Sequence, residues 1–444
     1  MTGIRKLSAA VIVALGLFLT GAVSPVARGQ ETCGNKYNLA EYNAYTAATG
    51  EKAPAQQIKL LDDFVQKYPT SQLLCFIYQT YYQNYNTQKN FPKVIEYADK
   101  LLAMGEKAEG GMRYTAYYAR AFAFTNMNVT DKEQALKARD AAVAGQKALE
   151  EIKKPENMSD EDFNKQKLQP TILFNYTAAS ACTTAKDFAC ATKYYKETLR
   201  YTPNEPVTWF RLGVAYLSST PPQQLDGFWA LARSVSLKGQ SEAQVRKYLR
   251  NQMQNYQQAS CENLLDAELN ELVALAGSSP DRPASYKLPS GADLEAARKD
   301  MTIASVIADL KAGGEKGKVT WLASCGLEFP DVPGKLFEVK PGTDAVVLRT
   351  AFVTNQTEFD AATKPDMEIK VVGQPGAGRL EKDSAPRFTG MLVSFDPEPA
   401  FLLHWDKAKV NAEDIPAEKK QETKKPATKK APARRPRAKK PPQP

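Results

Sequence analysis

Few residues of this chain have the types and spacing that enzyme chemistry needs. His404 is the only histidine among 444 residues, and it stands beside Trp405 in a stretch that reads as a strand. A histidine-based triad or metal site would have to use this one residue. The glycine-rich run at 373–378 lacks the lysine and following helix that phosphate binding needs, and pairs such as Asp62 and Asp63 fit solvated helix surfaces. We predict a non-enzymatic protein without cofactor or metal; a hydrolase that depends on His404 is the catalytic alternative.

The six cysteines indicate disulfides rather than a metal site. Their number is even, no CxxC pair occurs, and zinc sites usually combine such pairs with histidines. Cys182 is expected to end one helix and Cys190 to begin its antiparallel partner, which predicts a bridge between them. A loop this short stabilises by roughly 2–3 kcal/mol through chain entropy. The pairing of Cys33, Cys75, Cys261 and Cys325 stays open.

The first 29 residues are typical of a secretory signal peptide. Arg5 and Lys6 precede an apolar run at 7–23, and Ala27-Arg28-Gly29 offers a small-residue cleavage site. The alternative is an uncleaved membrane helix, but the run is short for a bilayer span. We therefore expect an exported protein of the periplasm or cell envelope.

The net charge of +9 is concentrated at the two ends of the chain. Residues 1–29 carry +3 and residues 411–444 carry +7, which leaves about −1 for the folded body. The last 34 residues alternate lysine and arginine pairs with proline and alanine, a composition that predicts disorder. This basic tail suits anionic surfaces such as phospholipid head groups, envelope polymers or nucleic acid. The alternative is a solvating tail without a dedicated target.

Residues 172–238 read as two consecutive helical hairpins with a period of about 34 residues. In the second hairpin Trp209, Leu212, Gly213 and Tyr216 form one apolar helical stripe, and Pro203 closes the hairpin before it. Small residues at Ala179 and Gly213 would allow close approach of the second helix of each pair. Such a unit cannot bury its apolar face alone, so neighbouring hairpins must stack on it.

This pattern resembles the tetratricopeptide repeat (TPR), and the resemblance covers about residues 37–240. It implies a right-handed helical superhelix that serves as a protein-binding scaffold, with ligands in a concave groove. Carried onto the matching positions, the resemblance implies these groove residues: Leu173, Tyr176, Ser180, Thr183, Phe210, Val214 and Leu217. The dense aromatic residues at 76–85 either line this groove as well or pack against flanking helices.

From residue 318 onward the pattern changes to strands. Five segments alternate β-branched or aromatic residues with polar ones, between turns rich in Pro, Gly and Asp. They resemble a small OB-fold barrel, a fold that often binds nucleic acid on exposed aromatic rings. Inward packing is the favoured role here for the rings Phe337, Phe352, Phe388, Phe395 and Trp405.

The predicted fold is therefore mainly α, with a TPR-like solenoid, a small OB-like barrel and a disordered tail. The expected parts are a signal peptide at 1–29, helical repeats at 30–277 and a linker with one helix, from 292 to 312, at 278–317. The β domain follows at 318–410 and the tail at 411–444. The predicted function is a scaffold that binds a protein or peptide in its groove, with no small-molecule substrate and no preference for nucleic acid. The alternative is a nucleic-acid or envelope-polymer binder that acts through the barrel and the tail.

Overall fold

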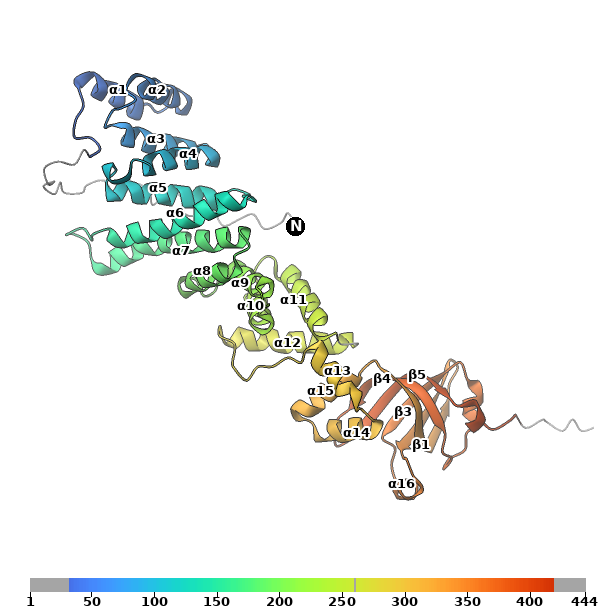
Figure 1. The fold of residues 1–444 in the computed structure, drawn as a ribbon. Coiled ribbons are helices and arrows are strands. Elements are labelled where there is room, and N and C mark those ends of the chain that lie inside the picture. The colour runs from blue at the N-terminus through green and yellow to red at the C-terminus, as the bar shows by residue number, and fades with distance from the viewer. Residues whose placement is uncertain (1–31, 259–260, 419–444) are drawn as a thin grey trace, which may run out of the picture. The chain divides into compact units, whose positions relative to one another are not determined.

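The computed structural model describes residues 32–258 and 261–418. The expected signal peptide and most of the expected basic tail lie outside these ranges. The chain forms two compact units, Met1–Asp293 and Leu294–Pro444, and each is described here by itself. The first is helical, and the second combines short helices with a barrel (Figure 1).

The first unit is a stack of helices in which consecutive helices pack against each other from α3 to α10. Contacts also join α1 to α3, α3 to α5 and α5 to α7, so alternate helices form a continuous layer (Figure 1). The helices are α1 (Leu39–Gly50), α2 (Pro54–Lys67), α3 (Leu74–Thr87), α4 (Phe91–Leu102), α5 (Gly110–Thr125), α6 (Lys132–Glu151), α7 (Asp160–Thr184), α8 (Phe188–Tyr201), α9 (Pro206–Ser218), α10 (Gln224–Ser236), α11 (Glu242–Gln257) and α12 (Glu262–Ser278).

Local sequence signals fix where many of these helices begin. Asn38 forms a capping box with Glu41 at the start of α1. The Asp131 and Asp187 carboxylates accept backbone N–H bonds at the starts of α6 and α8, at 2.8 and 3.1 Å. These caps satisfy N–H groups that have no partner inside the helix.

The acidic, polar composition of residues 154–168 favours an insertion between repeats, but this interpretation is wrong. The 25-residue helix α7 begins at Asp160. Ser159 caps it by accepting the Asp162 N–H at 3.1 Å. The acidic residues of its first turn, at 160–162, face the positive end of the helix dipole, so this acidic run marks a helix start.

The second unit differs from expectation at its beginning. Instead of one helix over 292–312, the chain forms α13 (Gly291–Lys299), which contains the boundary between the units, and α14 (Ile303–Ala312). The first helix ends at Lys299, and Thr302 starts the second by forming a capping box with Ser305. Residues 318–324, expected in the β region, belong to helix α15 (Gly314–Ser324).

The barrel contains the five expected strands. They are β1 (Glu328–Pro341), β2 (Ala345–Phe352), β3 (Met367–Val372), β4 (Arg387–Asp396) and β5 (Leu402–Val410), and they close in the order β1-β2-β3-β5-β4. β3 and β5 pair in parallel, and the other neighbours are antiparallel. Short helices α16 (Gln356–Ala361), η2 (Pro375–Arg379) and η3 (Ala412–Asp414) lie between or after the strands.

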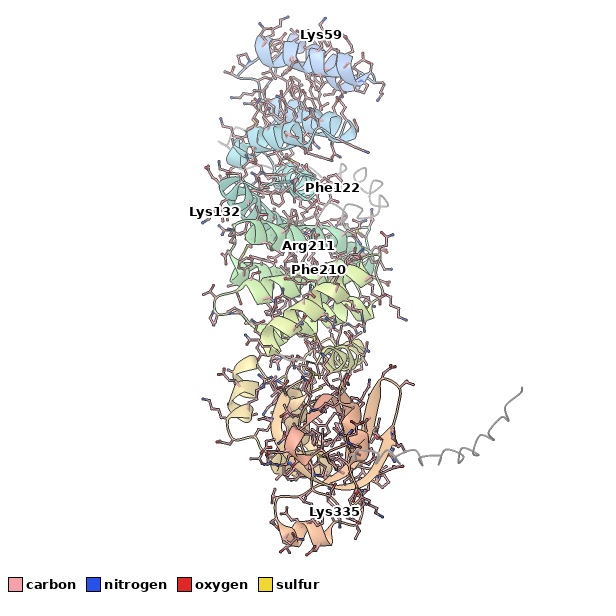
Figure 2. The ribbon with its side chains drawn as sticks, turned by 90° about the vertical axis from the view of Figure 1, so that its right-hand side faces the viewer. Lys59, Phe122, Lys132, Phe210, Arg211 and Lys335 are labelled. Atoms are coloured by element: carbon pink, nitrogen blue, oxygen red, sulfur yellow. A yellow bond between two sulfur atoms is a disulfide. The ribbon has the colours of Figure 1, made fainter. Side chains whose placement is uncertain are left out.

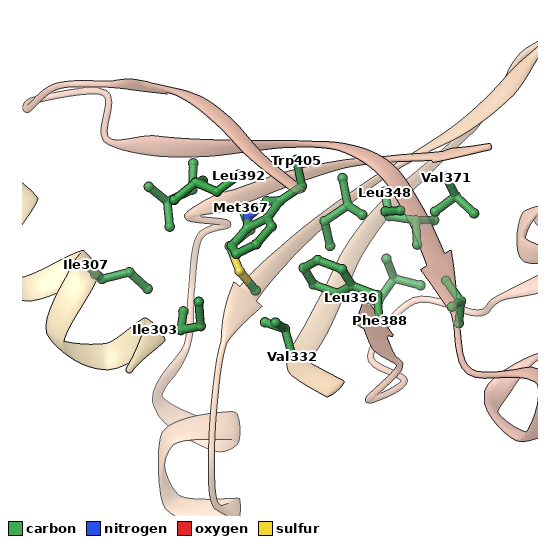
Figure 3. Packing of buried hydrophobic residues seen from close by; sticks show 14 of the residues in the cluster. Ile303, Ile307, Val332, Leu336, Leu348, Met367, Val371, Phe388, Leu392 and Trp405 are labelled. Atoms are coloured by element: carbon green, nitrogen blue, oxygen red, sulfur yellow. The ribbon is translucent and has the colours of Figure 1, made fainter. Parts of the chain in front are cut away.

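Alternate strand residues fill the barrel interior. Leu336, Phe388 and Trp405 converge there with Ile303 and Ile307 of α14, which cover the barrel (Figure 3). The residues after Val410 continue this packing, although the basic tail was expected to start at 411. Ile415 packs against the same core, and the Asp414 carboxylate accepts the Arg387 N–H at 2.8 Å.

Disulfides tie together parts of the first unit. The predicted bridge between Cys182 and Cys190 is confirmed, with Cα atoms 5.7 Å apart. A second bridge joins Cys33 to Cys75 across 42 residues of sequence. None of the six cysteines, all of which lie in the described ranges, is free. Disulfides persist in oxidising compartments, which agrees with an exported protein. No helix in the described parts of the chain is both long and apolar enough to cross a membrane.

Candidate functional site

The seven groove candidates lie on α7 and α9, and all are half-buried. Leu173 packs beside tyrosines of α5, while Phe210, Val214 and Leu217 pack against the core that α10, α11 and α12 share. The Thr183 hydroxyl lies 3.2 Å from the Tyr195 hydroxyl of α8. Most candidates are therefore engaged by neighbouring helices.

Tyr176 and Ser180 differ from the others because they meet a charged group of the next repeat. The Arg211 guanidinium of α9 lies over the Tyr176 ring, 5.0 Å from its centroid. One guanidinium nitrogen, Nη1, donates to the Ser180 hydroxyl at 3.3 Å. The contact joins α7 and α9 across one repeat, and Figure 2 shows Arg211 next to Phe210 in the helical stack.

Arg211 has no carboxylate partner within 4.0 Å among the described residues. Burial raises the pKa of Tyr176 to about 12, so the phenol is neutral at pH 7 and leaves the arginine charge uncompensated. Glu205 is the acid nearest to this pair in sequence, and its negative charge contributes to raising the pKa of Tyr176. Its carboxylate accepts the Val207 N–H at 3.2 Å and so caps α9.

The sequence reading missed Arg211. The apolar stripe of α9 identifies its buried positions, and arginine does not belong to such a stripe. The repeat period gives the signal that could have found it. Arg211 follows Thr177 by one period of about 34 residues, which places it opposite Tyr176 and Ser180.

Residues expected to be structural hold the α9 hairpin in place. The Trp209 indole N–H donates to the Pro203 carbonyl at 2.9 Å. Trp209, Gly213 and Tyr216 are buried. They position Arg211 because they fix the start and the rotation of the helix that carries it.

The aromatic rings of the barrel are largely used for packing. Phe388 and Trp405 are buried in the core, and Phe352 and Phe395 pack partly against it. Phe337 lies near the Lys335 ammonium, 5.6 Å from ring centroid to nitrogen. Two of the five rings are thus inaccessible to a stacking base.

His404 is held between two carboxylates on the outside of the barrel. Its Nε2 lies 2.9 Å from an Asp396 oxygen, and its Nδ1 lies 3.5 Å from a Glu368 oxygen. Glu368 also pairs with Arg349 at 2.8 Å. Both ring nitrogens therefore face carboxylates, an arrangement that fits a row of polar contacts across neighbouring strands. Within the described ranges, no group of three or more His, Cys, Asp or Glu residues is arranged to hold a metal ion.

Comparison with protein-family models and with curated proteins finds no match to this chain. The feature that points to a ligand is the contact of Arg211 with Tyr176 and Ser180, which we name the Arg211 site.

Proposed function

We propose that the protein is a non-enzymatic, exported scaffold of the tetratricopeptide-repeat type that binds an acidic peptide segment of a partner protein. The segment would lie in the groove between α7 and α9, and the basic tail would contact an anionic surface of the periplasm or cell envelope. The stack of helical pairs supports a repeat scaffold. The disulfides support an oxidising compartment outside the cytoplasm.

The observation that carries this proposal is the uncompensated charge of Arg211. A partly buried cation loses hydration, and in proteins such charges are usually paired. Here its neighbours are the phenols of Tyr176 and Tyr195 and the hydroxyl of Ser180, none of which is a carboxylate. A ligand carboxylate would supply the missing charge, and the planar guanidinium can donate two parallel hydrogen bonds to it.

The test compares two variants that each remove one positive charge. Arg211→Gln removes the charge of the Arg211 site, and Lys132→Gln removes an exposed charge at the start of α6 (Figure 2). The mature protein and both variants would be crosslinked to envelope extracts, and recovered partners would be identified. We then expect an acidic peptide of the partner to bind Arg211→Gln about 10- to 100-fold more weakly, the loss typical of one charge-assisted hydrogen bond.

The control variant Lys132→Gln should bind that peptide like the unmodified protein. Equal affinity of both variants, or undiminished binding after the peptide carboxylates are amidated, would contradict the proposed site. Recovery of no protein partner at all would contradict the scaffold function. Polymer or nucleic-acid binding by the barrel and tail remains the alternative, but the burial of Phe388 and Trp405 weakens the case for base stacking.

A further inference from the structure

A second concave site lies between α1 and α3, away from the Arg211 site. It is a cleft of about 690 Å³ lined by eleven residues of α1, the α1–α2 turn, the start of α2, and α3. This volume falls within the range of small-molecule sites, about 300–1,000 Å³. We name it the α1–α3 cleft.

Both ends of the α3 wall are tied to neighbouring segments. At the start of α3, Cys75 is bonded to Cys33, and the Gln72 side-chain oxygen accepts the Lys36 N–H at 2.7 Å. At the end of α3, the Asn84 amide donates to Gln57 at 2.7 Å. The cleft is thus preorganised, which lowers the entropy lost when a ligand binds.

The polar lining is uncharged except for one lysine. No aspartate or glutamate is among the described residues that line the cleft, and exposed Lys52 is the single cation. The side-chain amides of Gln79 and Gln83 make no hydrogen bond to any described residue, so they are free to donate and accept.

The threonine hydroxyl groups that line the cleft can accept hydrogen bonds from a ligand. Thr49, Thr80 and Thr87 each donate their hydroxyl proton to a carbonyl of their own helix, at 2.9, 2.8 and 2.7 Å. Their oxygens keep lone pairs for a ligand donor. A ligand that fits this lining must itself carry many groups that both donate and accept, as hydroxyl groups do.

A row of aromatic rings leads from the surface into the cleft. Tyr37 stacks on Tyr42 with centroids 5.4 Å apart, Tyr42 lies 6.3 Å from Tyr45, and Tyr45 lies 5.9 Å from Phe76 in the cleft wall. Tyr37 is 49% and Tyr42 is 42% exposed. Such rings offer flat apolar faces with polar tips, which suit ligands that have both apolar and hydroxyl-bearing faces.

We propose that the α1–α3 cleft binds a neutral oligosaccharide. The C–H faces of the sugar rings would lie on the tyrosine row, and the sugar hydroxyls would bond to Gln79, Gln83 and the threonine oxygens. An acidic ligand would need more cationic groups than Lys52. A peptide anchored by apolar side chains would need aliphatic pockets, and the lining contains no Val, Leu, Ile or Met among its described residues.

The experiment uses the full mature chain on an array of neutral oligosaccharides, followed by calorimetric titration of the best binder. The double variant Gln79→Ala/Gln83→Ala should weaken binding about tenfold or more, since each amide supplies hydrogen bonds to the sugar. The matched control Gln56→Ala/Gln66→Ala changes two exposed glutamines of α2 outside the cleft and should bind like the unmodified protein. Arg211→Gln should also leave sugar binding unchanged, which separates this proposal from the acidic-peptide function.

Three outcomes would overturn the proposal. They are the absence of binding to every neutral oligosaccharide, equal affinity of the two double variants, and displacement of the bound sugar by the acidic peptide of the Arg211 site. Melting curves would verify that both double variants are folded.

Discussion

Gly213 and Gly227 show how closely the two helices of one pair approach. A Cβ atom added at Gly213 would lie 2.7 Å from the Leu231 Cγ and 3.0 Å from the Gly227 carbonyl oxygen. One added at Gly227 would lie 2.6 Å from the Leu217 Cγ. Because a backbone oxygen is part of the contact, a side-chain rotation alone cannot make room. The close approach of α9 and α10 that was expected at Gly213 therefore requires a residue without a Cβ atom.

The variant Gly213→Ala should destabilise the protein by about 1 kcal/mol. Overpacking costs about 1–3 kcal/mol, which exceeds the gain in helix propensity of up to about 1 kcal/mol. The matched control is Gly111→Ala in the first turn of α5, where an added Cβ meets no atom within 4 Å. That variant should leave stability unchanged or raise it. Urea unfolding of both would measure the difference, and equal shifts in the same direction would refute the argument.

Among the elements, the strands and the second half of α7 were predictable, and the first half of α7 was not. Alternation of apolar and polar residues identifies all five strands because it follows the geometry of a sheet with one buried face. In α7, Pro170 and the acidic run before it favour a loop, since proline removes a helix hydrogen bond. Pro170 is nevertheless buried in the helix interior, so tertiary packing outweighs the local preference.

The candidate-site residues likewise divide into those that the sequence pattern identifies and those that only the structure brings together. The offsets of the repeat identify Tyr176 and Ser180 as groove positions. Arg211 is overlooked because α9 is read from its stripe of apolar residues, to which an arginine does not belong. The cleft between α1 and α3 depends on the Cys33–Cys75 pairing and on the Asn84–Gln57 hydrogen bond. No periodicity relates these residues along the chain. Contacts between non-repeating segments therefore had to come from the structure.

The α14–α15 hairpin predicts a defined pH dependence of stability. The Asp309 carboxylate pairs with the Lys316 ammonium at 2.8 Å and accepts the Thr320 hydroxyl at 2.9 Å. The bond from Lys316, followed by that from Thr320, lowers the pKa of Asp309 below its ordinary value. The stabilisation is therefore fully present above the ordinary aspartate pKa of about 4, and it is lost as pH falls through the lower folded-state value.

Asp309→Asn should reduce stability at pH 7 by about 1 kcal/mol, a small value because Lys316 is largely exposed. The difference between this variant and the unmodified protein should shrink as pH falls below about 4. Thermal unfolding at several pH values would measure it. Asp300→Asn, which removes an exposed carboxylate from the same unit, is the control and should show little difference at any pH. A constant penalty for Asp309→Asn at all pH values would exclude the ion pair as its cause.

At the scale of the whole molecule, positive charge is concentrated at the two ends of the sequence. Of the total charge of +9, residues 1–31 carry +2 and residues 419–444 carry +10, so residues 32–418 carry −3. Any general attraction to an anionic surface must then come from the chain ends. The proposed Arg211 site, in contrast, would recognise a charge locally and in a fixed geometry.

The basic tail should account for binding to anionic vesicles, and a chain that stops at Glu418 tests this. The truncation keeps Ile415 and Asp414, which a cut at 411 would remove from the barrel. Basic residues near an anionic membrane contribute about 1 kcal/mol each, and about 1 M salt shortens the screening length to about 3 Å. We expect a chain of residues 30–444 to sediment with phosphatidylserine vesicles at low salt and to be released at high salt, whereas the truncated chain, residues 30–418, stays in solution. Equal sedimentation of the truncated chain would assign the attraction to the folded units, and no sedimentation of either would leave the tail a solvating segment.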